Sequence, residues 1–299
     1  MRESMTEKVK GSQHTLRILG EVLRRKQTSA VIVGDAERLL QLVPDATFRC
    51  CVTSPPYWGL RDYGIPHQIG AEPKLPEYLD NLVRAFRQVR RVLADDGTMW
   101  LNLGDSYTSG NRRWRAPDRK NPARAMRYRP QTPEGLKPKD LIGVPWRLAL
   151  ALQADGWYLR ADVIWHKPNC QPESVRDRPT RAHEYIFLFS KSKDYYYDQE
   201  GVRERANGNG RLRNRRTVWS INTEPFAKSH FATFPPSLVD PCIRAGSAEG
   251  DMVLDPFFGS GTVGVVCENL GRRFVGIELN PEYAQIAKTR LGESKVLWH

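Results

Sequence analysis

Short apolar runs alternate with amphipathic segments along this chain, and the pattern predicts an α/β fold. Runs rich in β-branched and aromatic residues indicate buried strands near 30–33, 48–53, 98–103, 160–165, 184–190, 252–256 and 273–277. Apolar residues at helical spacing predict helices at 36–43, 76–93, 140–154, 237–245, 262–270 and 281–291. The alternation favours a doubly wound, mostly parallel sheet. We expect the strands at 160–165 and 184–190, which lack a clear helix between them, to form an antiparallel edge pair.

The strand predicted at 48–53 ends in the string Thr53-Ser54-Pro55-Pro56-Tyr57. Two consecutive prolines carry no backbone N–H, so they cannot continue a sheet ladder and the chain must turn there. The turn presents a hydroxyl, carbonyl oxygens and aromatic faces together at the carboxyl end of the strand. Such a turn could hold a planar group that offers N–H donors.

A second motif follows the strand predicted at 252–256. Residues 259–264, Gly-Ser-Gly-Thr-Val-Gly, fit the pattern G-x-G-x-x-G and open a predicted helix. Glycines let the backbone turn tightly and approach a ligand without Cβ clashes. The next predicted strand ends at Glu278, whose carboxylate could accept hydrogen bonds from two ribose hydroxyls. Taken alone, this pattern also fits a nicotinamide dinucleotide site.

The two motifs together resemble a known enzyme family, the DNA amino-methyltransferases. Ser54–Tyr57 resembles the family's catalytic motif, Ser/Asp/Asn-Pro-Pro-aromatic, while Asp255–Phe258 and Gly276–Asn280 look like its S-adenosylmethionine site. The catalytic string precedes the cofactor glycines, as in the circularly permuted β group of the family. The resemblance covers roughly 30–105 and 140–299, and further matching segments lie at 31–35, 165–169, 183–191 and 230–235.

The resemblance implies a fold and a cofactor. The fold is a Rossmann-like class I methyltransferase domain with a seven-stranded, mostly parallel sheet and inserted DNA-recognition loops, and the cofactor is S-adenosyl-L-methionine. The implied cofactor-binding residues are Asp35, Thr233, Phe234, Pro235, Asp255, Pro256, Phe257, Gly259, Ser260, Gly261, Thr262, Glu278 and Asn280. Asp35 would lie near the adenine, although it is equally suited to cap the helix that follows it.

The resemblance also implies the catalytic residues Ser54, Pro55, Pro56 and Tyr57. Ser54 Oγ and the Pro55 carbonyl would accept the two N–H bonds of an exocyclic base amine, and Tyr57 would stack on the flipped base. Serine at the first position is commoner in the family's N4-cytosine enzymes than in its N6-adenine enzymes. The sequence therefore favours N4 of cytosine, with N6 of adenine as the alternative.

The charge balance predicts a polyanionic partner. The 299 residues include 46 Lys and Arg against 34 Asp and Glu, a net charge of +12. Two long predicted loops are especially basic: 107–139 has ten basic residues and two acids, and 201–219 has six arginines and one acid. Clustering beside tryptophans favours a nucleic-acid surface over a merely solvated one. The candidate DNA-binding residues are Arg112, Arg113, Arg115, Arg211, Arg213, Arg215 and Arg216.

These observations divide the chain into consecutive segments. They are an N-terminal arm (1–28), a catalytic half (29–105), a basic DNA-binding insertion (106–139), the remainder of the catalytic half (140–200), a target-recognition segment (201–229) and a cofactor-binding half (230–299). The expected partner is double-stranded DNA, and a second copy of the chain and a cognate restriction endonuclease are further candidates. Without a signal peptide or a long apolar run, we expect a cytoplasmic, nucleoid-associated protein and no membrane partner.

Other functions stay open at this point. A nicotinamide-dependent oxidoreductase, a DNA-binding protein without activity and an RNA amino-methyltransferase each explain part of the pattern. Pro241-Cys242 invites a nucleophilic cysteine, but a position within a predicted helix argues against it. The histidines His166 and His183 lack metal-ligand spacing, so no metal site is expected.

Overall fold

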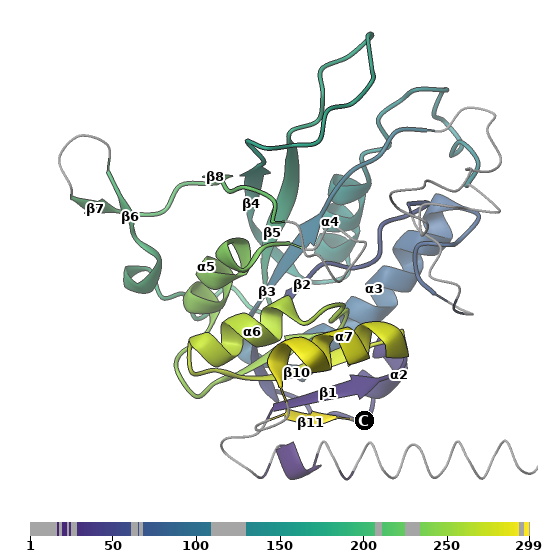
Figure 1. Cartoon of the computed structure of the whole chain (residues 1–299). Coiled ribbons are helices and arrows are strands. Elements are labelled where there is room, and N and C mark those ends of the chain that lie inside the picture. The colour runs from purple at the N-terminus through teal and green to yellow at the C-terminus, as the bar shows by residue number, and fades with distance from the viewer. Residues whose placement is uncertain are drawn as a thin grey trace, which may run out of the picture.

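A nine-stranded sheet forms the middle layer of the protein (Figure 1). The computed structural model describes residues 17, 20–22, 24, 29–60, 65, 68–108, 130–206, 211–224, 234–292 and 296–298. Most of the predicted N-terminal arm, residues 109–129 of the basic insertion, and residues 225–233 therefore lie outside the described residues.

The sheet has the strand order β11-β1-β10-β9-β2-β3-β5-β4-β8. In that order the strands are Val296–Trp298, Ser29–Val33, Arg273–Glu278, Met252–Asp255, Phe48–Thr53, Leu93–Leu103, His183–Ser190, Tyr158–His166 and Val218–Ser220. Neighbouring strands are parallel except at β5, which is antiparallel to both β3 and β4. All seven predicted strands are present, and the predicted antiparallel pairing of β4 with β5 is confirmed.

The sheet also holds two strands that the sequence pattern did not predict, β8 and β11, one at each edge. Because β8 covers β4, the β4–β5 pair does not form the edge of the sheet as predicted. Both additional strands are three residues long, too short to give a periodic signal. A separate hairpin of β6 (Glu204–Arg205) and β7 (Leu212–Arg213) projects from the body of the molecule (Figure 1).

Helices cover both faces of the sheet. One face packs against α2 (Ala36–Leu40), α3 (Leu75–Val92) and α4 (Val144–Ala154). The other packs against α5 (Pro236–Gly246), α6 (Thr262–Asn269) and α7 (Pro281–Leu291), which lie in front of the sheet in Figure 1. A short 3₁₀ helix, η2 (Glu200–Val202), precedes β6. In the described residues, no helix is long and apolar enough to cross a membrane.

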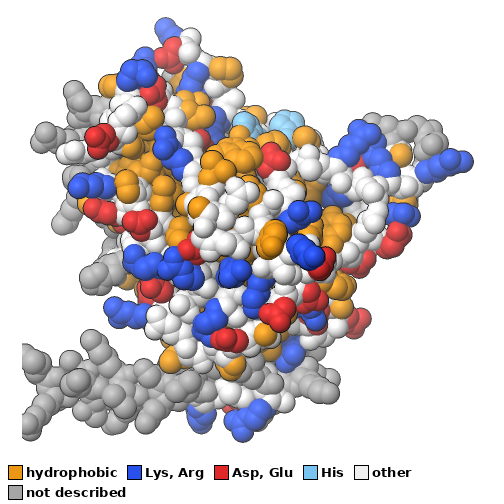
Figure 2. Space-filling view, turned by 180° about the vertical axis from the view of Figure 1, so that it is seen from behind, with side chains coloured by type: hydrophobic (Ala, Val, Ile, Leu, Met, Phe, Trp, Pro, Cys, Tyr) orange, Lys and Arg blue, Asp and Glu red, His pale blue; other side chains and the backbone are white. Residues whose placement is uncertain are grey.

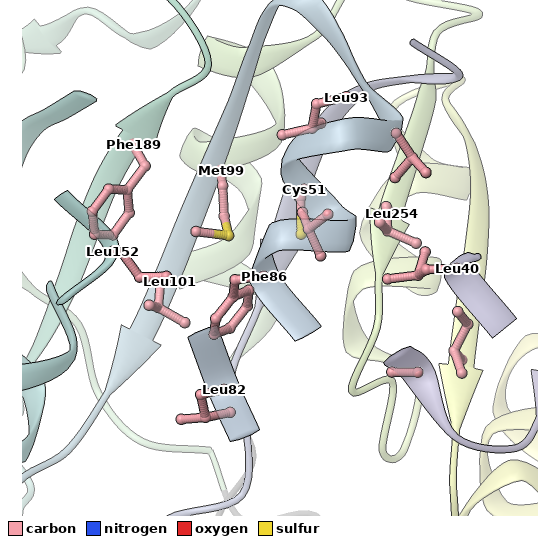
Figure 3. Close-up of a cluster of buried hydrophobic side chains, with 14 of the residues drawn as sticks. Leu40, Cys51, Leu82, Phe86, Leu93, Met99, Leu101, Leu152, Phe189 and Leu254 are labelled. Atoms are coloured by element: carbon pink, nitrogen blue, oxygen red, sulfur yellow. The ribbon is translucent and has the colours of Figure 1, made fainter. Parts of the chain in front are cut away.

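Alternating side chains of each strand supply the two hydrophobic cores. Cys51 contributes to the core under α3, whereas its neighbours Cys50 and Val52 face α5 and α6. Figure 3 shows Leu82 and Phe86 of α3 within the first core, together with strand residues such as Met99. Burial on both faces explains why these strands read as continuous apolar runs rather than as alternating ones.

Local chemistry sets where the helices begin. Helix α4 starts at Val144, four residues later than predicted, because Gly143 adopts a left-handed conformation (φ 76°) just before it. The Asp105 carboxylate then accepts from the backbone N–H groups of Gly143 and Val144, at 2.9 and 3.0 Å. Periodicity alone misses this boundary, which Gly143 and Pro145 mark locally and which Asp105, 38 residues away along the chain, stabilises.

The pairing of β2 with β9 joins the two motifs found in the sequence. Cys50 pairs with Val253 and Cys51 with Leu254 in parallel register. At the carboxyl end of the pair, Thr53 Oγ1 donates a 2.7 Å hydrogen bond to Asp255 Oδ1, which also accepts from the Phe257 N–H at 3.1 Å. Both side chains are buried. The catalytic string and the glycine turn therefore leave the sheet side by side.

Burial raises the pKa of the Asp255 carboxyl from 3.8 to about 7, although its hydrogen bonds to Thr53 and Phe257 oppose the rise. In this interval the folded protein holds a proton that the unfolded chain releases. The contribution of Asp255 to the free energy of unfolding therefore falls as pH rises from about 4 to about 7.

We predict that Asp255→Asn removes this pH dependence, because the amide oxygen can still accept from Thr53 and Phe257. Relative to wild type, the variant should gain up to about 1.4 kcal/mol for each pH unit within the interval, measured by urea unfolding of the protein without ligands. Asp194→Asn, at an 89% exposed side chain, controls for the loss of one negative charge. Parallel stability profiles of wild type and Asp255→Asn would contradict the prediction.

Candidate active site

One cavity of about 360 Å³ holds both motifs at the carboxyl ends of the parallel strands. Ser54, Pro55, Pro56 and Tyr57 line it from β2, and Pro256, Phe257, Phe258, Gly259, Ser260 and Thr262 line it from β9. The sheet order places β1 and β10 on one side of the β2–β9 pair, and β3, β5 and β4 on the other. The cavity therefore has two ends. We call the end at Gly259–Thr262 the glycine-turn end and the end at Ser54–Tyr57 the tyrosine end. In open α/β sheets this edge is where ligands bind.

Gly261 fixes the shape of the glycine turn. Its φ of 82° is left-handed, and it precedes the first residue of α6. A Cβ on Gly261 would lie 3.1 Å from Ala287 Cβ and 3.3 Å from Phe258 Cε1. A side chain at Gly261 is therefore opposed by the left-handed φ and by tight packing behind the turn, and Gly261 does not form the wall of the cavity.

Glu278 lies at the end of β10 and braces the glycine turn. Its Oε2 accepts from the Gly259 N–H at 2.7 Å, and its Oε1 accepts from the Asn280 N–H at 2.8 Å. Burial raises the pKa of this carboxyl, while the backbone donors oppose the rise. Each carboxylate oxygen can accept more than one hydrogen bond, so Glu278 keeps capacity for a ligand hydroxyl while it holds the turn.

Two further side chains at this end have structural roles that a ligand could share. Asp35 caps α2, since Oδ1 accepts from the Arg38 N–H at 2.9 Å, and it also lines the cavity. Asn280 caps α7 by accepting from the Glu282 N–H at 2.9 Å and lines the cavity as well. Capping and ligand binding are compatible at both positions.

A buried hydroxyl marks this end as a polar ligand site. Ser260 lines the cavity, and its Oγ is buried without a hydrogen-bond partner in the part of the chain that the structure describes. A buried polar atom left unpaired costs about 1–3 kcal/mol. Together with the carboxylates of Asp35 and Glu278, this hydroxyl suits a nucleoside that carries several hydroxyl and amino groups.

The remaining expected cofactor residues divide into three groups. Phe234, Pro256, Phe257 and Thr262 line the cavity. Asp255 and Pro235 do not: Asp255 is buried beneath the turn, and Pro235 precedes the first residue of α5. Thr233 lies outside the described residues.

At the tyrosine end, the Ser54–Tyr57 loop is fixed from behind. The Tyr78 hydroxyl of α3 donates to the Pro56 carbonyl at 2.9 Å, and Trp58 Nε1 donates to the Glu72 carbonyl, also at 2.9 Å. Tyr78 and Trp58 are both buried. The loop that carries Ser54 is therefore held in place before any substrate arrives.

A polar network at this end was not anticipated from the sequence. The Tyr57 hydroxyl donates to Glu184 Oε2 at 2.8 Å, and Asn102 Nδ2 donates to the same oxygen at 3.3 Å. Lys167 pairs with the other oxygen, Oε1, and its Nζ lies 4.0 Å from the centre of the Trp165 ring. These side chains all line the cavity.

The network keeps the tyrosine neutral and oriented. Burial raises the pKa of Tyr57 well above its ordinary value, and the adjacent Glu184 carboxylate adds to the rise. The hydroxyl therefore remains a donor, which ties the ring to β5. Residues 165–169 and 183–191 had matched the family pattern, and the side chains Lys167 and Glu184 were the signal that could have revealed this network.

The candidate DNA-binding arginines differ in their surroundings. Arg213 pairs with Glu204 at 2.9 Å, and the guanidinium of Arg215 lies 4.6 Å from the centre of the Trp219 ring. Arg211 and Arg216 are exposed. Arg112, Arg113 and Arg115 lie outside the described residues. Figure 2 shows basic side chains interspersed with acidic ones over the back of the molecule, so net charge alone does not locate a DNA surface.

Other chemistry finds little support in the described residues. Cys242 is buried within α5, its Sγ lies 3.4 Å from the Leu238 carbonyl, and burial raises the pKa of its thiol. That environment opposes a nucleophilic thiolate. His166 Nδ1 lies 3.0 Å from Ser220 Oγ, and no cluster of three or more possible metal ligands occurs in the part of the chain that is described.

Known proteins resemble this chain along most of its length. Residues 48–289 match the family model of N6/N4 DNA methylases. The type II methyltransferase M.SmaI of Serratia marcescens is 66% identical over 262 residues, which cover 87% of this chain and 90% of that protein. M.XycI of Xanthomonas campestris pv. cyanopsidis, also a type II methyltransferase, is 63% identical over 263 residues, covering 88% and 87% of the two chains.

Solved structures share the fold. TTHA0409 of Thermus thermophilus, complexed with S-adenosyl-L-methionine, superposes with a TM-score of 0.62 at 26% identity, over 90% of this chain and 97% of that one. The cytosine-N4-specific PvuII DNA methyltransferase gives a TM-score of 0.67 at 21% identity, over 90% and 88%. The match to the family model begins with β2, the strand that leads into Ser54–Tyr57, and ends within α7. The chain therefore belongs to the N6/N4 family of DNA methylases.

Proposed function

We propose that this protein transfers a methyl group from S-adenosyl-L-methionine to the N4 amine of a cytosine flipped out of double-stranded DNA. The observation that carries the proposal is the single cavity in which Ser54–Tyr57 faces the glycine turn. A donor at one end and a base at the other would meet there. Family membership favours this reaction over the nicotinamide-dependent alternative, which shares only the glycine pattern.

The glycine-turn end supplies groups suited to the cofactor. Glu278 and Asp35 offer acceptors for ribose hydroxyls and for the adenine amine, and Ser260 offers an unpaired hydroxyl. Phe234 and Phe257 add apolar walls. When bound, S-adenosyl-L-methionine supplies a methyl group activated by its positively charged sulfur, so the protein has to contribute position and electrostatics.

The tyrosine end has to prepare a poor nucleophile, because the lone pair of an exocyclic amine is delocalised into the base. Ser54 Oγ and the Pro55 carbonyl accept its two N–H bonds, which favours a pyramidal nitrogen with its lone pair aimed along the cavity. Tyr57 stacks on the base, and its hydroxyl is held by Glu184. When the nitrogen gains the methyl group it gives up one of its two protons, for which the Ser54 Oγ and Pro55 carbonyl acceptors are placed, and no covalent intermediate between protein and base is needed.

Ser54 favours cytosine as the target base. Among the DNA amino-methyltransferases whose catalytic motif Ser54–Tyr57 resembles, serine at this position is commoner in N4-cytosine enzymes. Aspartate or asparagine is commoner in N6-adenine enzymes. Both amines present the same pair of N–H donors, so N6 of adenine is the second candidate. Flipping either base costs a few kcal/mol, which phosphate contacts from the basic segments would offset.

The names of the relatives suggest the setting. M.SmaI and M.XycI are named type II methyltransferases, which suggests a restriction-modification context. We propose a cognate endonuclease as the biological partner, and the segments 106–139 and 201–229 as the elements that read the DNA. A homodimer would bring a second set of basic segments to the DNA.

The experiment that tests the proposal is transfer of tritiated methyl from S-adenosyl-L-methionine to native and denatured genomic DNA, with mass spectrometry of the nucleosides. We expect N4-methylcytosine. N6-methyladenine would correct the base, and unlabelled DNA would overturn the proposed activity.

In the same assay, Ser54→Ala should bind the cofactor normally but lose turnover by about 100-fold or more, because one acceptor for the amine is gone. Ser192→Ala, in the turn after β5 and away from the cavity, is the matched control. Wild-type turnover by Ser54→Ala would refute the role of its hydroxyl.

Gly261→Val should abolish cofactor binding measured by calorimetry, because its Cβ meets Ala287 and Phe258 and displaces the turn. Gly250→Val is a close control, since Gly250 has the same φ of 82° but nothing within 4 Å of an added Cβ. Equal cofactor affinity in the two folded variants would show that the turn tolerates displacement.

Two substitutions of Tyr57 distinguish the role of its ring in stacking from the role of its hydroxyl in hydrogen bonding. Tyr57→Phe keeps the ring, so turnover should remain within several-fold of wild type while stability falls by about 1–3 kcal/mol through the loss of the bond to Glu184. Tyr57→Ala should reduce turnover by about 100-fold or more, because the stacking surface is lost. Similar turnover in the two variants would argue against stacking.

A further inference from the structure

A second cavity, of about 410 Å³, lies beside the catalytic loop. Trp58, Gly59 and Leu60, which directly follow Tyr57, form part of its wall. Leu60 lines both cavities, so the two are neighbours across one side chain. The two cavities therefore adjoin each other close to the catalytic loop.

The acidic groups of this cavity are already engaged. The Asp105 carboxylate accepts from the backbone N–H groups of Ser106, Gly143 and Val144, at 2.8 to 3.0 Å. Glu173 Oε2 accepts from Arg178 Nη1 at 2.5 Å and from the Arg181 N–H at 3.3 Å. The charge of Glu173 is balanced by Arg178, whereas Asp105 keeps its negative charge and is stabilised by three backbone N–H groups, so Arg181 is the cation that has to attract an anion here.

Arg181 supplies an uncommitted cationic donor. Arg181 lines the cavity, and its Nη1 is buried without a hydrogen-bond partner within the described ranges. Arg178 differs, because Glu173 holds it and its guanidinium lies 3.9 Å from the centre of the Tyr107 ring. A buried guanidinium nitrogen without an acceptor is costly, and an anion in the cavity would offset that cost.

The other lining groups suit a nucleotide. Trp58 and Tyr107 place aromatic side chains at its wall, the Tyr107 ring with Arg178 on one face, and Thr108 and Gln131 add polar residues. A cation combined with aromatic walls is the combination that proteins use to hold the backbone and bases of nucleic acids.

We propose that this cavity binds the nucleotide next to the target base on the same strand, with its phosphate on the Arg181 guanidinium. The proposal rests on the proposed function, since it takes the tyrosine end as the site of the flipped base. Fixing a neighbouring phosphate would hold the strand in the extruded geometry and place the amine against Ser54.

The test uses the full chain and a duplex that contains one methylation site mapped in wild-type product DNA. Each phosphate near the target base is replaced in turn by a neutral methylphosphonate, and the dissociation constant is measured for wild type, Arg181→Gln and Arg244→Gln. Arg244 pairs with Asp240 on α5 and lines neither cavity, so its variant controls for the loss of one positive charge.

We expect neutralisation of one phosphate directly beside the target nucleotide to weaken wild-type binding by about tenfold. Arg181→Gln should weaken binding of the unmodified duplex by a similar factor and should no longer respond to that substitution. Arg244→Gln should respond as wild type does.

If Arg181→Gln and the neutral phosphate weaken duplex binding independently, so that their two factors multiply, the proposal is overturned. It is also overturned if Arg181→Gln is coupled only to a phosphate that is not adjacent to the target nucleotide. If Arg181→Gln does not fold, the wild-type scan still decides, because insensitivity at both adjacent phosphates is incompatible with an occupied Arg181. The genomic methylation assay from which the site is mapped is scored separately: if methylation occurs there but the coupling is absent, only this inference fails, and if no DNA is methylated, the proposed function itself fails.

Discussion

The active-site arrangement depends on the parallel pairing of β2 with β9 and on the buried hydrogen bond from Thr53 to Asp255 that ends it. These residues are 202 positions apart in the sequence. Because β2 and β9 are paired in parallel, the loops that follow them, Ser54–Tyr57 and the glycine turn, begin side by side at the same edge of the sheet. Without that register, a base and a methyl donor bound to the two loops would have no common cavity.

The rest of the fold keeps those two loops still. Tyr78 and Trp58 fix the catalytic loop from behind, while Glu278 and the packing around Gly261 fix the glycine turn. Since the proposed chemistry needs orientation more than it needs proton transfer or a covalent step, rigidity of this kind is the main contribution that the protein can make. The hydrogen bond from Tyr57 to Glu184 likewise fixes the ring that is proposed to stack on the base.

Sequence patterns predicted what depends on local chemistry. The strands ending at Thr53, Asp255 and Glu278 were recognisable because apolar runs stop at proline, glycine or acidic residues. Sequence patterns could not show contacts between side chains that the sheet order brings together, such as the hydrogen bond from Tyr57 to Glu184 on β5. Nor could they separate Asp255, which supports the turn from below, from residues such as Ser260 that face the cavity. Both limits arise because contact between distant segments leaves no periodic signal.

A crystal structure of the protein with S-adenosyl-L-methionine would show whether the two loops bind their ligands in one cavity. We expect the ribose to lie against Glu278 at the glycine-turn end, with the methyl-bearing sulfur pointing along the cavity toward Ser54. A cofactor bound outside this cavity, or bound with its sulfur directed away from Ser54, would contradict this expectation.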